Sequence, residues 1–199
     1  MIAALSGLPA HASDWNFQVL LDGKPLGSHH FQVTEQGPAT TLLSEADFRV
    51  TLFAVPLFRY RHVSHESFHG DCLQNLEAIT ENNGIRQEVR GSATDSAFVV
   101  TTRQGASTLP SCVMTFDYWN PHILQQSRLL NPQTGEYVPI VVTRLGSENL
   151  VVDGKPVPAD VFLITAHAMK IKLWYSTAQR WLGLESPTAD GRLMRYQLR

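Results

Sequence analysis

Apolar residues recur at every second position over most of the chain, and this period constrains the fold more than any other feature. In the first such run, Trp15, Phe17, Val19 and Leu21 alternate with mostly polar residues, the pattern of a strand with one buried face. An Asp22-Gly23 turn then leads into a second alternating run over residues 27–34. The sequence therefore predicts a β-hairpin at the start of the domain.

The same pattern continues to the C-terminus. Turn signals separate runs rich in Val, Ile, Thr, Phe and Tyr, at Asn83-Gly84, Gln104-Gly105, Leu145-Gly146-Ser147, Asp153-Gly154 and Asp190-Gly191. In the C-terminal part, strands are expected over residues 137–145, 150–153, 160–166, 169–176, 181–186 and 193–198. A sheet of about ten or more strands usually curls or closes to remove its exposed edges. We therefore expect a mainly β fold, a curled antiparallel sheet or barrel.

One segment departs from the β pattern. Asn120 is a good helix N-cap and Pro121 suits the first helical position, while Asn131-Pro132 ends the run. The sequence predicts one short helix near residues 120–130, which would cover an end of the sheet or lie against its concave face.

The length and charge of the chain limit the functions that it can have. A chain of 199 residues favours a single domain, and 16 Lys and Arg against 18 Asp and Glu give a formal net charge of −2. Such a chain has no surplus of basic residues to neutralise a phosphate backbone, so nucleic acid is excluded as the main partner. The sequence does not indicate the oligomeric state.

The first twelve residues resemble the end of a secretory signal. They are short, apolar and rich in small residues, and they finish in Ala10-His11-Ala12, an A-x-A-like cleavage pattern. We expect residues 1–12 to be a remnant of such a signal and residues 13–199 to form one β-barrel-like domain. A periplasmic or secreted location follows from this prediction, and an ordinary N-terminal tail is the alternative.

Cys72 and Cys112 are the only cysteines in the chain. In an oxidising compartment two cysteines of one domain most simply form a disulfide. A catalytic thiol or a metal site is disfavoured because there is no C-x-x-C spacing.

The densest set of titratable residues lies between Tyr60 and His69. On a strand, Tyr60, His62 and Glu66 would point to one face, so the three histidines of this run cannot converge on a metal ion, and none is expected. His62, Glu66 and, further along, Asp117 are weak candidates for acid–base catalysis. No nucleophile elbow, zinc-protease, phosphate-loop or dinucleotide motif accompanies them, so no cofactor is expected and a non-enzymatic role is favoured.

The favoured hypothesis is an exported binding or carrier protein that holds an apolar or lipid-like molecule in the concave face of the sheet. Its candidate ligand-binding residues are aromatic: Phe17, Phe31, Tyr60, Phe116, Trp119 and Trp174. Peripheral contact with a membrane is left open. The alternatives are a hydrolase or lyase that uses His62, Glu66 or Asp117 in the same cavity, and a structural envelope protein whose interior is filled and binds no ligand.

Several short motifs carry a resemblance to a family. These are Tyr60-x-His62-x-Ser64-x-Glu66, Gly70-Asp71-Cys72-Leu73, Asn83-Gly84, Asp117-Tyr118-Trp119-Asn120, Trp174-Tyr175 and Asp190-Gly191-Arg192. Together they resemble an uncharacterised family of exported bacterial proteins, the domain-of-unknown-function family 6134, over nearly the whole chain after residue 13. That family implies no activity, cofactor or catalytic residue. In architecture the expected fold is distantly similar to periplasmic lipoprotein-carrier proteins, and a fold does not fix a function.

Overall fold

The structure is a computed structural model that describes residues 10–52, 55–167 and 169–199. Its described residues form strands and one 3₁₀ helix, η1. The elements are β1 (His11–Leu21), β2 (Lys24–Gln36), β3 (Ala39–Leu52), β4 (Val55–His69), β5 (Cys72–Asn82), β6 (Ile85–Ala93), β7 (Phe98–Thr102), β8 (Gly105–Leu109), η1 (Pro121–Gln125), β9 (Arg128–Leu130), β10 (Tyr137–Pro139), β11 (Val141–Val152), β12 (Lys155–Ala166), β13 (Met169–Ser176), β14 (Trp181–Pro187) and β15 (Leu193–Leu198).

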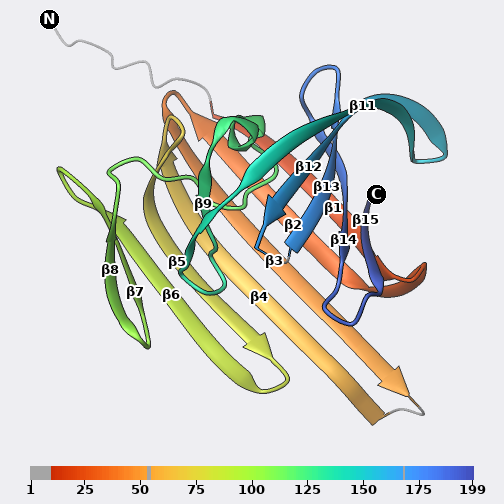
Figure 1. The fold of residues 1–199 in the computed structure, drawn as a ribbon, viewed down its shortest axis with the longest axis horizontal. Helices are drawn as coiled ribbons and strands as arrows, with labels where there is room; N and C mark the ends of the chain where they lie inside the picture. Colours follow the sequence, from red (N-terminus) through yellow and green to blue (C-terminus); the bar gives the residue numbers. More distant parts are fainter. Residues whose placement is uncertain (1–9, 53–54, 168) are drawn as a thin grey trace, which may run out of the picture.

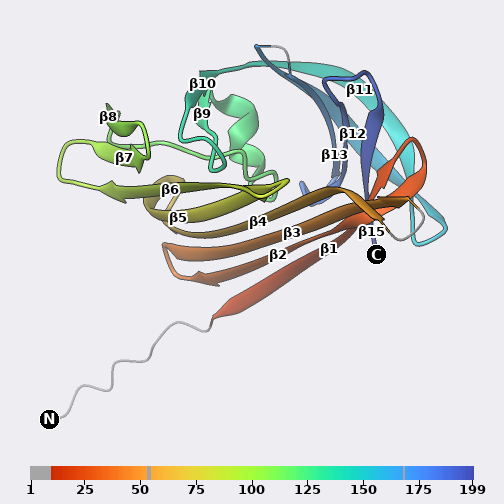
Figure 2. The same ribbon diagram turned by 90° about the horizontal axis from the view of Figure 1, so that it is seen from below.

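Thirteen of these strands form one antiparallel sheet in the order β11-β12-β13-β14-β15-β1-β2-β3-β4-β5-β6-β7-β8. The sheet curls so that β11 to β14 rise over the strands of the N-terminal half, as Figures 1 and 2 show. Strands β8 and β11 are its two edges among the described residues. The expected curled antiparallel sheet is therefore confirmed, and it is barrel-like without closing its ring of hydrogen bonds.

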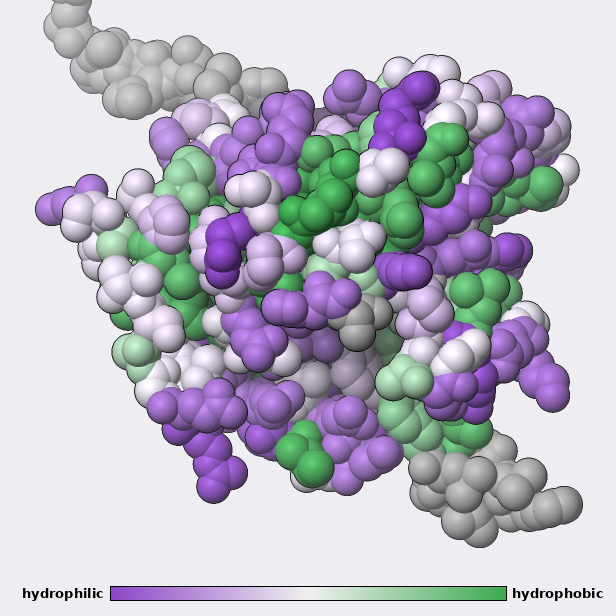
Figure 3. Space-filling view, in the orientation of Figure 1, coloured by the Kyte–Doolittle hydropathy of each residue, from purple (hydrophilic) through white to green (hydrophobic). Residues whose placement is uncertain are grey.

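Alternation along the strands divides buried from exposed side chains. On β4, His62, Ser64, Glu66 and Phe68 are buried and the residues between them are exposed or half-buried. The same rule places most large apolar residues in one continuous core on the concave side of the sheet. Hydrophilic side chains cover much of the face seen in Figure 3, and apolar ones gather toward its upper half.

Two details of the expected strand pattern are wrong. Leu145-Gly146-Ser147 does not end a strand, because β11 continues through it with a bulge between Arg144 and Gly146. Gly146 has a φ of +125°, a backbone angle that glycine adopts easily at a bulge because it has no side chain. The expected strand over residues 137–145 is divided between β10 and β11, because β10 pairs with β9 in a separate small sheet.

The helix is shorter than expected. Asn120 caps η1 by accepting a hydrogen bond from the backbone N–H of His122, and Pro121 stands at its start, as predicted. The helix stops at Gln125, however, and Arg128 to Leu130 form β9. Pairing with β10 satisfies the backbone of this stretch, so tertiary contacts outweigh its helical propensity.

The chain between β8 and β11 crosses the concave side of the sheet, and we call residues 110–140 the crossing segment. Figure 2 shows η1, β9 and β10 above the layer formed by β4, β5 and β6. Gly135, with a φ of +77°, makes the turn of this segment fit against β7, since a Cβ there would meet Cγ2 of Thr102 at 2.5 Å. The segment is thus packed into the concavity.

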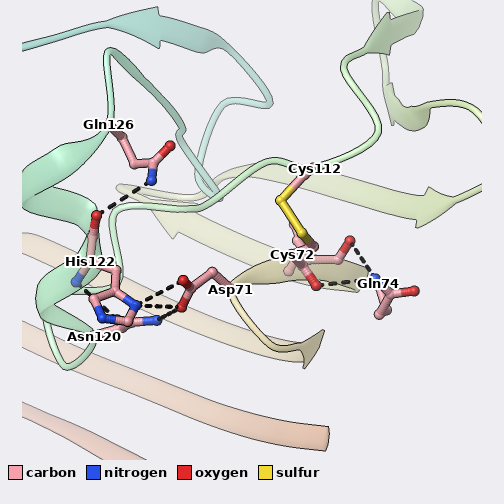
Figure 4. Close-up of a disulfide and its surroundings, with 8 residues drawn as sticks. Asp71, Cys72, Gln74, Cys112, Asn120, His122 and Gln126 are labelled. Atoms are coloured by element: carbon pink, nitrogen blue, oxygen red, sulfur yellow. Dashed lines mark hydrogen bonds and ion pairs between the residues drawn. A yellow bond between two sulfur atoms is a disulfide. The ribbon is translucent and has the colours of Figure 1, made fainter. Parts of the chain in front are cut away.

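A disulfide between Cys72 and Cys112 fastens the crossing segment to β5, which confirms the predicted pairing. Beside it, Nδ1 of His122 lies 2.8 Å from Oδ2 of Asp71, and the side-chain amide of Asn120 donates to Oδ1 of Asp71. Figure 4 shows these contacts at one end of η1. The disulfide and the Asp71 contacts together hold the segment at two points.

Residues 1–9 lie outside the described residues, and His11 and Ala12 are the first residues of β1, paired with Glu35 and Thr34 of β2. The proposed leader over residues 1–12 stays a prediction. Among the described residues, no helix has the length and apolar character that a membrane-spanning helix needs.

Removal of the disulfide should destabilise the domain. The cysteines are 40 residues apart, and the chain-entropy model gives about 4 kcal/mol for a loop of this length. We expect the free energy of unfolding, measured with urea, to fall by about that amount when a reductant is added to the oxidised protein. The Cys72→Ser, Cys112→Ser double variant should already have the lower stability and should not respond to reductant. An unchanged midpoint on reduction of the wild type would contradict this role.

Candidate functional site

Polar residues occupy part of the concave face where an apolar core is expected. They are buried, and they come from β3, β4, β5 and the crossing segment: Ser44, His62, Ser64, Glu66, Thr80, Thr115 and Asp117. Buried polar groups cost free energy unless they are hydrogen-bonded. Their contacts therefore define the first candidate site.

A single hydroxyl group joins two carboxyl groups at the centre of this site. Oγ1 of Thr115 lies 2.8 Å from Oε2 of Glu66 and is also hydrogen-bonded to Oδ2 of Asp117. The hydroxyl of Ser64 donates to Oε1 of Glu66 at 2.5 Å. Two strand positions on β4 and two positions on the crossing segment thus converge, although they are far apart in the sequence. We call Glu66 and Asp117 the carboxyl pair.

The contacts of Thr115 set a minimum number of protons on the carboxyl pair. A threonine hydroxyl carries one proton, so it donates to one of the two carboxyl groups and accepts from the other. Accepting requires a donor, and the only donor that a carboxyl group offers is its own acidic proton. The carboxyl pair therefore holds at least one proton when both contacts to Thr115 are hydrogen bonds.

Burial acts in the same direction. It raises the pKa of Glu66, and it raises the pKa of Asp117 well above its ordinary value, with the nearby charge of Glu66 adding to the effect. Because the two groups interact, their proton belongs to the pair rather than to either residue. One carboxylic acid and one carboxylate, or two acids, are the states expected near neutral pH.

Two histidines face the same space in their neutral forms. His29 hydrogen-bonds through Nε2 to Oγ of Ser44 at 2.8 Å and through Nδ1 to the hydroxyl of Tyr196 at 3.2 Å. Nδ1 of His62 is 2.9 Å from Oγ1 of Thr80. Burial lowers the pKa of His62 to about 4 and the pKa of His29 well below its ordinary value. Neither ring supplies a positive charge at neutral pH.

These groups surround a cavity of about 200 Å³. Its polar lining residues include His29, Ser44, His62, Glu66, Asp117 and Tyr196. Its apolar lining residues include Phe31, Phe116, Met169, Ile171, Leu184 and Met194. Wider hollows of about 630 and 810 Å³ lie elsewhere on the protein, but the full carboxyl pair and both neutral histidines line the 200 Å³ cavity and neither of these hollows.

The structure brings the three weak catalytic candidates together, because His62, Glu66 and Asp117 all line the cavity. Phe31 and Phe116 line it as well. Of the other aromatic candidates, Phe17 packs in the core against Trp181 at 4.3 Å between ring centroids, and Tyr60 stacks on Phe48 at 5.2 Å.

Two aromatic candidates are separated from the cavity. Trp119 lines the 810 Å³ hollow and packs edge-on against Phe68. Trp174 lies in a second apolar cluster with Val161 and Leu182, and its indole N–H donates to Glu148. Its neighbour Tyr175 belongs to the main core, so alternation turns Trp174 to the opposite face of the sheet.

Sequence reasoning missed His29, Ser44, Thr115 and Tyr196. For His29 the signal was present, since it stands on the same face as Phe31 and Val33 in an alternating run and is therefore directed inward. Thr115 had no such signal, because the path of the crossing segment is set by tertiary contacts. Within the described residues no group of three or more His, Cys, Asp or Glu is placed to hold a metal ion.

Substitution of Asp117 by asparagine should change how stability depends on pH. The folded-state pKa of each carboxyl in the pair lies above its unfolded value, so the stability that the pair contributes is present at low pH and is lost as pH rises through the folded pKa. The amide side chain of the variant does not titrate. From pH 5 to pH 8, D117N should therefore gain stability relative to the wild type, by at most about 1.4 kcal/mol per pH unit.

This difference is measured by urea unfolding of both proteins at each pH. The neutral histidines, His29 and His62, are present in both, so their effect on the pH dependence cancels in the comparison. A stability difference that is constant with pH, or that favours the wild type increasingly at high pH, would contradict a raised pKa.

None of the curated proteins compared with this chain matches it. Among solved structures, the chain is similar to the crystal structure of a β-barrel-like protein of domain of unknown function DUF1849 from Brucella abortus. The two share 13% sequence identity with a TM-score of 0.67, and the likeness covers 97% of each chain, so it shows the barrel-like fold. The model of the family described as domain of unknown function (DUF6134) matches residues 17–199. The family resemblance seen in the sequence motifs is thereby confirmed, and the chain belongs to the DUF6134 family.

Proposed function

We propose that this protein binds a small amphipathic molecule in the cavity on the concave side of its sheet, in an oxidising compartment outside the cytoplasm. The observation that carries the proposal is the cavity itself, which is lined by both polar and apolar side chains of the sheet and the crossing segment. Binding sites in proteins commonly combine an apolar lining with a few placed polar groups. The disulfide between Cys72 and Cys112 supports an oxidising location.

The size of the cavity indicates the size of the ligand. An apolar cavity of about 150 Å³ holds benzene, so about 200 Å³ suits an aromatic ring with a short polar arm. A long acyl chain would need more room than this. We therefore narrow the expected lipid-like ligand to a small amphipathic one, with its ring against Phe31, Ile171 and Leu184 and its polar group toward the carboxyl pair.

Binding of 2-phenylethanol tests this proposal, because it is a neutral molecule of the expected size and polarity. We expect saturable binding at one site, measured by isothermal titration calorimetry. Met194→Trp, which places a larger side chain at the cavity wall, should weaken binding at least tenfold. Its control is Leu193→Trp on the same strand, because Leu193 is exposed and does not line the cavity. Equal affinities of the two variants, or no binding to the wild type, would contradict the proposal.

A second candidate function is acid–base catalysis in the same cavity, and the observation that favours it is the contact of both carboxyl groups, Glu66 and Asp117, with the hydroxyl of Thr115. A carboxylic acid next to a carboxylate provides a general acid and a general base in one place. His62 is neutral, and among the described residues its ring is hydrogen-bonded only through Nδ1. Its other ring nitrogen could accept a proton.

A panel of small p-nitrophenyl esters, glycosides and phosphates tests this second function. We expect turnover of a substrate in the panel to fall at least a hundredfold in both Glu66→Gln and Asp117→Asn, since general acid–base catalysis contributes about 10² to 10⁴ in rate. Glu45→Gln removes a carboxyl group from the outward face of β3 and should leave the rate unchanged. Turnover that survives both substitutions, or no turnover of any substrate, would count against catalysis.

A further inference from the structure

We propose that the ligand of the concave cavity is a small primary amine that carries an aromatic or compact apolar group, and that its ammonium group replaces one proton of the fully protonated carboxyl pair, which then keeps one proton and one negative charge. This inference rests on the proposed function, because it names the class of molecule that the cavity binds. Its first basis is the charge of the cavity lining. Glu66 and Asp117 line the cavity, whereas no lysine or arginine of the described residues does.

The carboxyl pair also lacks a positive partner elsewhere in the described part of the chain. The ion pairs there connect other acidic residues, such as Asp47 with Arg49 and Glu185 with Arg195, and none includes Glu66 or Asp117. The histidines that face the pair are kept neutral by burial. A negative charge in this cavity is therefore uncompensated by the protein, which is costly at a buried site.

The second basis is the position of Asp117. Asp117 is 5% exposed and lines the cavity, and its side chain is hydrogen-bonded to Thr115 through Oδ2 and to Glu66, the other member of the pair. An ammonium group has three donors and no acceptor, so it can take the place of a proton on the pair and also donate to a further acceptor, such as Nε2 of His62 in the tautomer whose Nδ1 donates to Thr80.

The aromatic residues that line the cavity suit such a cation. Phe31, Phe116, Tyr118 and Tyr196 line it, and aromatic faces attract ammonium groups at close range. The same lining and the negative pair disfavour a carboxylate ligand, because two like charges would be buried together. A neutral alcohol of equal size would gain the apolar contacts without the charge-assisted hydrogen bonds.

Binding of an amine should be linked to proton release. The titratable groups that face the carboxyl pair are His62 from β4, His29 from β2, Tyr196 from β15 and Tyr118 from the crossing segment. Burial raises the pKa of both tyrosines and lowers the pKa of both histidines, so all four are neutral between pH 6 and 8. Protons compete with the ammonium group for the carboxyl pair, and affinity for an amine should increase as pH rises over this range.

The experiment compares three matched probes: 2-phenylethylamine, 2-phenylethanol and phenylacetate. We expect the wild type to bind the amine about ten to a hundred times more tightly than the alcohol, because a single charge-assisted hydrogen bond contributes a binding free energy of that size. Phenylacetate should not bind. Calorimetry in two buffers with different heats of ionisation should show release of up to one proton with the amine and none with the alcohol.

The double variant E66Q/D117N should bind the amine and the alcohol equally, within about twofold, because it retains the shape of the cavity and loses its charge. The control E45Q/E77Q removes two exposed carboxyl groups from the outward face and should keep the preference for the amine. Thermal unfolding shows whether each variant is folded. If the double variant is not folded, the measurement of proton release from the wild type still tests whether the amine binds the carboxyl pair.

The outcomes separate this inference from the proposed function. Equal binding of amine and alcohol to the wild type would overturn the assignment of an amine and leave the cavity as a binding site. Amine binding that persists in E66Q/D117N, or that releases no proton, would also overturn it. Failure of all three probes to bind would overturn both proposals.

Discussion

Unbroken antiparallel pairing from β11 to β8 directs every second side chain of a thirteen-stranded sheet toward one concave space. Each inward position must be either apolar or supplied with a hydrogen-bonding partner, because water has little access there. Most of these positions are apolar and form the core. The exceptions on β2, β3, β4 and β5 lie next to one another, since Ser44 pairs across the sheet with Ser64 and His62 pairs with Thr80. A polar band inside an apolar core is the result.

The crossing segment completes this band. It brings Thr115 and Asp117 to Glu66, and it is held by the disulfide to β5 and by the hydroxyl of Tyr175, which donates to the backbone carbonyl of Tyr118 at 2.7 Å. Without this segment, Glu66 would be an isolated carboxyl on an open sheet. The site is therefore built from a regular element, which fixes one half, and an irregular one, which supplies the other half.

Much of the fold could be predicted from the sequence, because period-two alternation and turn residues are local signals. The β1–β2 hairpin, the inward face of β4 and the strands β13 and β15 follow from them directly. The bulge at Gly146 could not be predicted, since a glycine marks a turn and a bulge equally well. The shared proton site also escaped prediction. His62, Glu66 and Asp117 could each be named as polar residues in apolar surroundings, but their meeting depends on a contact over 49 positions through Thr115.

Among the described residues the sheet ends in two edges, β8 and β11, that are not paired with each other, and the β9–β10 hairpin lies within the concavity between them. In a closed barrel, the strand number and the stagger of its hydrogen bonds fix the girth. An open spiral has no such constraint, so its width depends on what packs inside it, which here is the crossing segment joined to β5 by the disulfide and to β13 by the hydroxyl of Tyr175. The room left for an interior cavity in this architecture is therefore determined by an irregular segment rather than by the number of strands.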